Sequence, residues 1–267
     1  MRMTGQTTHW YPERLLIPSL LEPHSLIVLN NPLSKLDPLF SQLWKKSTLK
    51  VAADGGANVL YDMCLLPDFV VGDLDSIKSI VRDHFTKESV VISQIKEQNS
   101  TDFEKCLRTI LEESKCDRNP SDFPKADNHG IIALCALQGR IDHVLSQLNT
   151  LYKHSCKTFE VGQRHLPKKE LFLISEQSVA WVLQPGAHTI HVNTCPSQTC
   201  GHVPLFTSVR KITTRGLKYD VTDMHMQMGG LISTSNSYMA NKVHIDNSDP
   251  VLWMMNFDIE DPVYWTS

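Results

Sequence analysis

The first half of the chain alternates short apolar runs with segments whose apolar residues recur at helical spacing, and this alternation constrains the fold more than any other feature. Each run ends close to Asn, Asp, Gly or Ser, as a buried strand typically does. We expect strands at 26–29, 49–53, 69–71, 90–92 and 131–137. We expect helices at 38–46, 56–63, 77–87, 101–115 and 143–153. Alternating strands and helices predict a mainly parallel sheet with helices on both faces, an α/β fold.

After about residue 155 the pattern changes to short β-like runs separated by turn residues such as Pro185-Gly186 and Gly229-Gly230. The expected strands lie at 171–174, 179–183, 188–192, 208–213, 231–234, 242–245 and 251–257. Many short strands without intervening helices indicate an antiparallel β-sandwich or barrel. The sequence therefore predicts an α/β domain followed by an antiparallel β domain.

Charge and cysteine content exclude several classes of protein. The 26 Lys and Arg residues nearly balance the 29 Asp and Glu residues, so a general nucleic-acid-binding surface is not expected. No apolar run is long enough to span a bilayer, and residues 1–22 lack the apolar stretch of a secretory signal, so we expect no membrane partner and a cytoplasmic location. The seven cysteines contain no CxxC pair, which argues against a disulfide scaffold or a zinc knuckle.

Several of the predicted strands lead directly into aspartates. Asp54 follows the run at 49–53, Asp73 and Asp75 follow the run at 69–71, and Asp142 follows the run at 131–137. Ligands of open α/β sheets bind at the carboxyl ends of the strands, so these carboxylates are expected in one cleft. A bend at Gly72 would turn Asp73 and Asp75 toward one cation, and carboxylate oxygens suit Mg²⁺.

Each carboxylate also has an interpretation that involves no ligand. Asp102 opens the predicted helix at 101–115, where a negative charge complements the helix dipole. Asp73 with Asp75 would fit an ordinary turn, and Asp54 would fit a helix cap before Gly55-Gly56. The two glycines permit close approach to a phosphate, but neither GxGxxG nor GxxxxGK[ST] is present.

An apolar lead into Asp-x-Asp is also found in haloacid dehalogenase-like phosphatases, where the first Asp is the nucleophile. That family has Thr or Val two residues after the second Asp, and Ile77 stands there in this chain. A later strand with a paired acidic motif is missing from the sequence as well. The phosphatase interpretation is therefore the weaker one.

Five motifs, taken together, resemble the thiamine pyrophosphokinase family, and most closely its animal members. In the order of that family they are Asp54-Gly-Gly-Ala-Asn58, Gly72-Asp-Leu-Asp-Ser76, Thr101-Asp-Phe-Glu-Lys105, Gly139-Arg-Ile-Asp-His143 and Leu231-Ile-Ser-Thr-Ser-Asn236. The resemblance implies an N-terminal extension at 1–24, an α/β nucleotide-binding catalytic domain at 25–155 and a β-sandwich thiamine-binding domain at 156–267. It also implies a homodimer with active sites between the subunits.

The reaction implied by the resemblance transfers the pyrophosphoryl group of ATP to the hydroxyl of thiamine, giving thiamine diphosphate and AMP. Asp73, Asp75 and Asp102 are then the catalytic and Mg²⁺-binding residues. The expected ATP-binding residues are Asp54, Gly55, Asn58, Arg140 and Asp142. The expected thiamine-binding residues are Gln98, Tyr219, Ser233 and Asn236.

Physical chemistry leaves three of these roles open. Asp73 or Asp102 would be the base that takes the thiamine proton. The Arg140 fork could bind two phosphate oxygens or pair with Asp142. The Tyr219 ring could stack on the thiamine cation or pack on the sandwich.

The chain departs from the family pattern in three places. Cys135 and Ala136 replace glycines before Gly139-Arg140, Asn99 replaces an acidic residue, and Met239 replaces an Asp of the animal enzymes. Cys135, Ala136 and Asn99 motivate one alternative to an active enzyme for thiamine, and a second alternative stays open beside it. One is a catalytically impaired thiamine- or nucleotide-binding protein, and the other is a pyrophosphokinase for another hydroxylated heterocycle.

Overall fold

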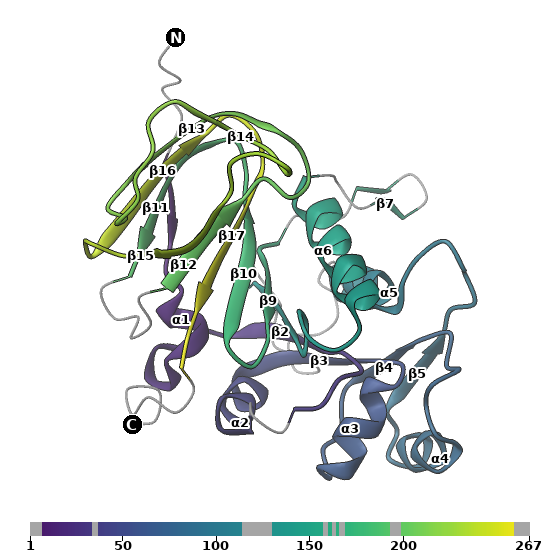
Figure 1. Ribbon diagram of the computed structural model, residues 1–267. Coiled ribbons are helices and arrows are strands. Elements are labelled where there is room, and N and C mark those ends of the chain that lie inside the picture. Colours follow the sequence, from purple (N-terminus) through teal and green to yellow (C-terminus); the bar gives the residue numbers. More distant parts are fainter. Residues whose placement is uncertain are drawn as a thin grey trace. The chain divides into compact units, whose positions relative to one another are not determined.

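The computed structural model describes residues 7–33, 37–113, 130–156, 160–161, 164–165, 169–192 and 199–258 (Figure 1). The chain separates into two compact units, one formed by Met1–Leu21 with Gln177–Ser267 and the other by Glu22–Glu176. We call them the β unit and the α/β unit. Within the described residues, no helix is long and apolar enough to cross a bilayer.

The described part of the α/β unit contributes six neighbouring strands of one sheet, in the order β9-β6-β2-β3-β4-β5, and every neighbouring pair among them is parallel. The strands are β2 (His24–Val28), β3 (Ser47–Ala53), β4 (Phe69–Gly72), β5 (Val91–Gln94), β6 (Ile131–Leu134) and β9 (Leu171–Ile174). Every residue of β2, β4, β6 and β9 is buried. Because successive residues of a strand point to opposite faces, both faces of the sheet are covered there. The predicted parallel sheet is confirmed.

The described part of this unit has five helices: α2 (Asp37–Lys46), α3 (Gly56–Asp62), α4 (Ser79–Lys87), α5 (Asp102–Glu113) and α6 (Ile141–Cys156). All five match predicted helices within a few residues, although 114–115 lie outside the described residues. α5 packs on β3 and β4 through a buried stripe that includes Phe103, Leu107 and Ile110. Their spacing of four and three residues places them on one face, which holds the first turn of α5 beside the ends of these strands.

The β unit contains two groups of strands, ordered β1-β11-β16-β13-β14 and β15-β12-β17-β10. Their bounds are β1 (Thr8–Trp10), β10 (Ser178–Leu183), β11 (Gly186–His191), β12 (Thr199–Val203), β13 (Val209–Arg215), β14 (Met224–Met226), β15 (Ser233–Ser237), β16 (Lys242–Asn247) and β17 (Val251–Asn256). All pairs within the groups are antiparallel except β1 with β11, which is parallel. The predicted antiparallel β-rich C-terminal part is confirmed.

Short elements complete the described chain. α1 (Glu13–Leu16) and the 3₁₀ helix η1 (Pro18–Leu20) follow β1, and β7 (Glu160–Val161) pairs with β8 (Arg164–His165).

Two assignments made from the sequence are wrong in detail. The run at 171–174 was expected in the antiparallel half, but it forms β9 and pairs in parallel with β6, because its four buried residues suit an interior strand. The strand predicted at 231–234 begins later, at Ser233, and both Leu231 and Ile232 are exposed. The sequence predicted domain boundaries after residues 24 and 155, and the two units of the structure are divided after Leu21 and Glu176.

The core of the β unit holds a row of rings on neighbouring strands. Trp181 pairs with Trp253 between β10 and β17, and His202 pairs with Trp253 between β12 and β17. The His202 and Trp253 rings are stacked, with centroids 6.4 Å apart and planes 6° from parallel. Neither ring nitrogen of His202 has a hydrogen-bond partner among the described residues. Burial lowers the pKa of His202 to about 4, so the ring is neutral at pH 7.

Candidate active site

Asp54 follows β3 and connects the loops that leave β3 and β4. Its backbone has a φ of 39°, in the left-handed region that Asp tolerates better than most residues. The Ser76 N–H donates to Asp54 Oδ2 at 3.0 Å and the Ile77 N–H donates to Oδ1 at 3.1 Å. The side chain therefore does not cap α3, whose N-cap residue Gly55 has no side-chain cap.

Gly72 allows the two other carboxylates to approach Asp54. A Cβ atom on Gly72 would lie 2.7 Å from the Asp54 Cβ, closer than real contacts permit, and a tight 3.1 Å from the Asp102 carboxyl carbon. Asp73 comes next, and its N–H donates to Asp102 Oδ1 at 3.2 Å. Asp102 is the first residue of α5, so the end of β4 is joined to the start of this helix.

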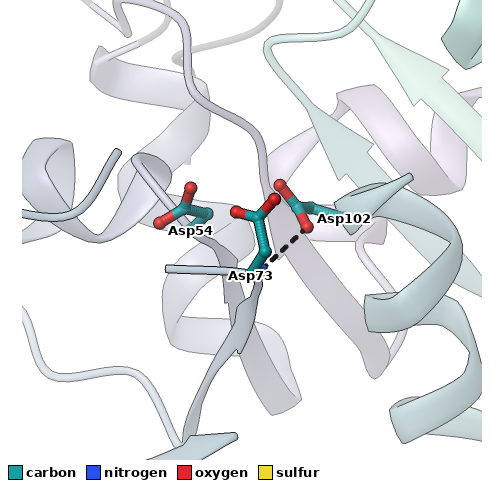
Figure 2. A group of neighbouring side chains, drawn as sticks. All are labelled: Asp54, Asp73 and Asp102. Atoms are coloured by element: carbon teal, nitrogen blue, oxygen red, sulfur yellow. Dashed lines mark hydrogen bonds between the residues drawn. The ribbon is translucent and has the colours of Figure 1, made fainter. Parts of the chain in front are cut away.

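Asp54, Asp73 and Asp102 each place one carboxylate oxygen within 4.8 Å of the other two (Figure 2). We call these three residues the aspartate cluster. The pKa of Asp54 is raised to about 6, chiefly by burial and also by the Asp102 carboxylate, although hydrogen bonds from the Ser76 and Ile77 N–H groups lower it. Three close carboxylates fit a hard divalent cation such as Mg²⁺, which takes oxygen ligands and relieves their mutual repulsion.

Asp75, predicted as a metal ligand with Asp73, lies outside this cluster among the described residues. The bend occurs at Leu74, which has a φ of 66°, and not at Gly72. As a result the Asp75 N–H donates a hydrogen bond to Asp73 Oδ1 at 3.3 Å, and the exposed Asp75 carboxylate accepts one from the Ser76 hydroxyl. Asp54 is the third member of the cluster, beside Asp73 and Asp102.

The aspartate cluster lines a cavity of about 340 Å³ in the α/β unit. Two further predicted residues, Gly55 and Gln98, line the same cavity. Asn58 is absent from the cavity wall, and its amide instead accepts from the Lys78 N–H at 2.9 Å and donates to the Ser76 carbonyl at 3.0 Å. Asn58 thus holds the loop that carries the Asp54 partners.

Arg140 and Asp142 form a bidentate ion pair on the surface of the α/β unit. The Arg140 Nε and Nη2 atoms lie 3.1 and 2.5 Å from the two Asp142 oxygens, and the side chains are 72% and 58% exposed. Neither residue lines the cavity. The pairing that the sequence left as an alternative to phosphate binding is the one observed.

Tyr219, Ser233 and Asn236 form one hydrogen-bonded group in the β unit. The buried Asn236 amide accepts from the Tyr219 N–H at 3.1 Å and donates to the Tyr219 carbonyl at 3.0 Å and to Ser233 Oγ at 3.2 Å. The Tyr219 ring is 62% exposed, so it is not packed in the sandwich, and the Lys218 ammonium lies 5.4 Å from its centre. Asn236 therefore fixes the backbone from which an exposed aromatic ring projects.

Sequence reasoning missed several residues of the cavity wall, among them Asn30, Asn31 and Lys105. Asn30 and Asn31 follow β2 as Asp54 follows β3, but their amides were not recognised as strand-end groups. The Asn31 amide donates to the Cys135 carbonyl at 2.9 Å, which holds Cys135 in the left-handed region at a φ of 62°. Lys105, inside the quoted Thr101–Lys105 motif and three residues from Asp102, also lines the cavity.

Comparisons with known proteins agree with this geometry. Residues 40–161 match the sequence model of the thiamin pyrophosphokinase catalytic domain, and residues 187–252 match that of the thiamin pyrophosphokinase vitamin B1 binding domain. Thiamine pyrophosphokinase 1 of Arabidopsis thaliana is 32% identical over 251 residues, covering 87% of this chain and 86% of the relative. The chain belongs to the thiamine pyrophosphokinase family.

Relatives from fungi extend the match in sequence and structure. Thiamine pyrophosphokinase of Saccharomyces cerevisiae is 29% identical, covering 90% of this chain and 87% of the relative. The solved structure of thiamin pyrophosphokinase from Candida albicans aligns with a TM-score of 0.77 at 25% identity, covering 97% of this chain and 96% of that one. The two-domain fold of thiamine pyrophosphokinases is therefore present in this chain.

The two family matches divide the predicted site residues. The match to the thiamine pyrophosphokinase catalytic domain contains the aspartate cluster and Gln98. The match to the B1-binding domain contains Tyr219, Ser233 and Asn236.

Proposed function

We propose that this chain transfers the diphosphate group of ATP to the hydroxyl of thiamine, producing thiamine diphosphate and AMP. The observation that carries the proposal is the aspartate cluster, which lies in a cavity within the residues that match the family's catalytic domain. Phosphoryl-transfer sites need charge neutralisation and positioning more than covalent chemistry, and clustered carboxylates that hold a metal provide both.

Asp54, Asp73 and Asp102 would hold Mg²⁺ in this proposal. Their chemistry fits it, because three oxygens of partly buried carboxylates lie together and Asp54 has a raised pKa that a cation would lower. The bound metal supplies charge neutralisation on the phosphate oxygens. We propose that Asp75, exposed beside the cluster, has a positioning role: its carboxylate accepts a hydrogen bond from the Ser76 hydroxyl.

Asp73 is our candidate for the group that receives the thiamine hydroxyl proton. Asp102 Oδ1 already accepts from the Lys105 ammonium and the Asp73 N–H, so both lone pairs of this oxygen are in use. Asp73 Oδ1 accepts only the longer Asp75 N–H bond among the described contacts. The proton would therefore move to Asp73 Oδ2, which the hydroxyl must reach directly or through a water.

The remaining predicted residues are proposed to bind the two substrates. Gly55, Asn58, Arg140 and Asp142 would contact ATP or hold the loops that do. Gln98, Tyr219, Ser233 and Asn236 would bind thiamine, whose cationic ring suits the exposed Tyr219 face. We further propose a cytoplasmic homodimer with active sites between subunits, as the family resemblance implies.

Product analysis tests the activity directly. Purified protein with ATP, thiamine and Mg²⁺ should form AMP and thiamine diphosphate in equal amounts, and none without Mg²⁺. Binding of thiamine or ATP without AMP release would contradict the proposal and favour a catalytically impaired binding protein. The left-handed backbone of Cys135 is the structural feature that makes this alternative worth testing. Faster AMP release with another hydroxylated heterocycle would change the assigned substrate.

A further inference from the structure

Lys105 is a buried lysine that lines the cavity beside the aspartate cluster. Its side chain is 2% exposed, and its ammonium lies 3.0 Å from Asp102 Oδ1. A lysine is almost never fully buried unless its charge is paired, so this position needs an explanation. Asp102 supplies one partner, and the rest of the ammonium's hydrogen-bonding capacity has to be considered.

The Lys105 ammonium has more donors than the pair with Asp102 uses. An ammonium has three N–H donors. The bond to Asp102 occupies one, and among the residues that the structure describes no other side chain or carbonyl accepts from it. A buried donor without a partner is costly, but a cavity can supply the missing acceptors as ligand oxygens.

Three other cationic side chains of the α/β unit pair with carboxylates. Arg140 pairs with Asp142 on the surface, Arg108 lies 3.0 Å from Glu97, and Lys153 lies 2.7 Å from the buried Glu104. Among the described residues, Lys105 is the only Lys or Arg that lines the cavity. It is therefore the positive side chain best placed to meet the phosphates of a nucleotide there.

We propose that Lys105 is a catalytic residue whose ammonium donates hydrogen bonds to the phosphate oxygens of the transferred group. This inference rests on the proposed function. In that step the thiamine hydroxyl oxygen forms a bond to the β-phosphorus, and the bond from this phosphorus to the α–β bridging oxygen breaks. The electron pair leaves with AMP and the hydroxyl proton goes to a carboxylate. Lys105 keeps its proton and stabilises charge on the non-bridging oxygens.

The competing explanation is that Lys105 only balances the charge of Asp102. The i, i+3 spacing on α5 makes such a pair easy to form. A counter-ion of this kind would affect stability and, through Asp102, the affinity for Mg²⁺, but at saturating Mg²⁺ it would leave binding of the phosphate chain unchanged. A phosphate contact would alter the affinity for ligands that contain the β- and γ-phosphates and not the affinity for AMP.

The test compares two ligands with the folded variant Lys105→Met. One is adenosine 5′-(α,β-methylene)triphosphate, whose α–β bridge is not cleaved, and the other is AMP, each titrated calorimetrically at saturating Mg²⁺. Loss of a charge-assisted hydrogen bond should weaken analogue binding about ten- to a hundredfold, with AMP binding changed less than about twofold. In the assay with ATP and thiamine, kcat should fall about 10²–10³-fold.

Two further variants keep the test decisive. Lys153→Met is the control, because it removes the ammonium that pairs with Glu104 and neither residue lines the cavity. It should lower stability and leave the affinity for the analogue unchanged. If Lys105→Met does not fold, Lys105→Gln keeps an N–H donor for Asp102 without the charge and should show the same loss. Wild-type analogue affinity in either folded Lys105 variant overturns the inference.

The outcomes also separate this inference from the proposed function. If the wild-type chain releases no AMP from ATP and thiamine, the proposed function fails, and the analogue titration still decides whether Lys105 binds the phosphate chain. If the wild-type chain releases AMP and Lys105→Met matches it, the inference about Lys105 fails and the proposed function remains.

Discussion

The two units of the molecule differ in where their buried polar groups lie and in whether those groups have hydrogen-bond partners. In the α/β unit the Asp54 carboxylate, the Asp102 carboxylate and the Lys105 ammonium meet at the ends of strands and beside a cavity. In the β unit His202 lies in the core against Trp253 without a partner for either ring nitrogen among the described residues. Charged groups gathered around a cavity serve ligands, whereas a neutral polar ring in a core lowers stability unless it has a partner.

Removing one carboxylate of the cluster should have the largest effect. Asp73→Asn is expected to lower AMP release by about 10³-fold or more, because the neutral amide is a poor metal ligand and a poor proton acceptor. Circular dichroism should show an unchanged fold, since the side chain is only partly buried. Asp83→Asn, an equal charge change at an exposed position of α4, should keep nearly full activity. Full activity of Asp73→Asn at saturating Mg²⁺ would remove Asp73 from the site.

The buried histidine of the β unit gives the next effect, on stability. The pKa of His202 is about 4 in the folded chain and near 6.5 when unfolded, so the unfolded state binds the extra proton between these values. The free energy of unfolding should therefore fall as pH decreases from about 6.5 to 4, by up to about 3 kcal/mol from this residue.

Urea unfolding of wild type and His202→Leu at several pH values measures this contribution. The difference between the two proteins should change across this pH range, because the leucine variant has no proton to bind there. His225→Leu, on exposed β14, is the control and should follow the wild-type pH dependence. Parallel pH profiles for wild type and His202→Leu would show that His202 keeps an ordinary pKa.

Crowding at the end of β4 should produce a smaller effect on both stability and activity. Gly72→Ala introduces a Cβ atom 2.7 Å from the Asp54 Cβ, so the strand end or the carboxylates must shift. We expect a loss of about 1–3 kcal/mol in stability and of ten- to a hundredfold in kcat. Gly130→Ala is the matched control, because its nearest neighbour would be an ordinary 3.4 Å away. Equal effects of the two substitutions would show that the tight approach at Gly72 is unimportant.

The outline of the α/β unit was predictable because buried parallel strands and amphipathic helices leave clear periodic patterns. The position of aspartates after β3 and β4 followed from the same pattern. The membership of the cluster did not, because it depends on left-handed backbone at Asp54 and Leu74, which non-glycine residues adopt only where surrounding contacts hold them.

The β unit was less predictable because its strands are short and their pairing is non-local. β1 has three residues and pairs with β11, 180 residues later in the chain, so the predicted extension at 1–24 gave no sign of it. The run at 171–174 did carry a signal, since continuous burial without alternation suits a parallel sheet. Ring stacking at His202 could be recognised only once β12 was placed beside β17.

The exposed ring of the β unit should have the smallest effect and tests whether this unit takes part in substrate binding. Tyr219→Ala is expected to raise the KM for thiamine about tenfold, the size of one cation–π contact, with less than about twofold change in the KM for ATP. Tyr219→Phe keeps the ring and should behave like wild type, because the backbone groups that Asn236 holds are the same in both variants. Equal increases for both substrates would instead mean that Tyr219 supports the structure of the unit. Because its ring is 62% exposed and its replacement removes little core packing, such a result would contradict the role proposed from its position.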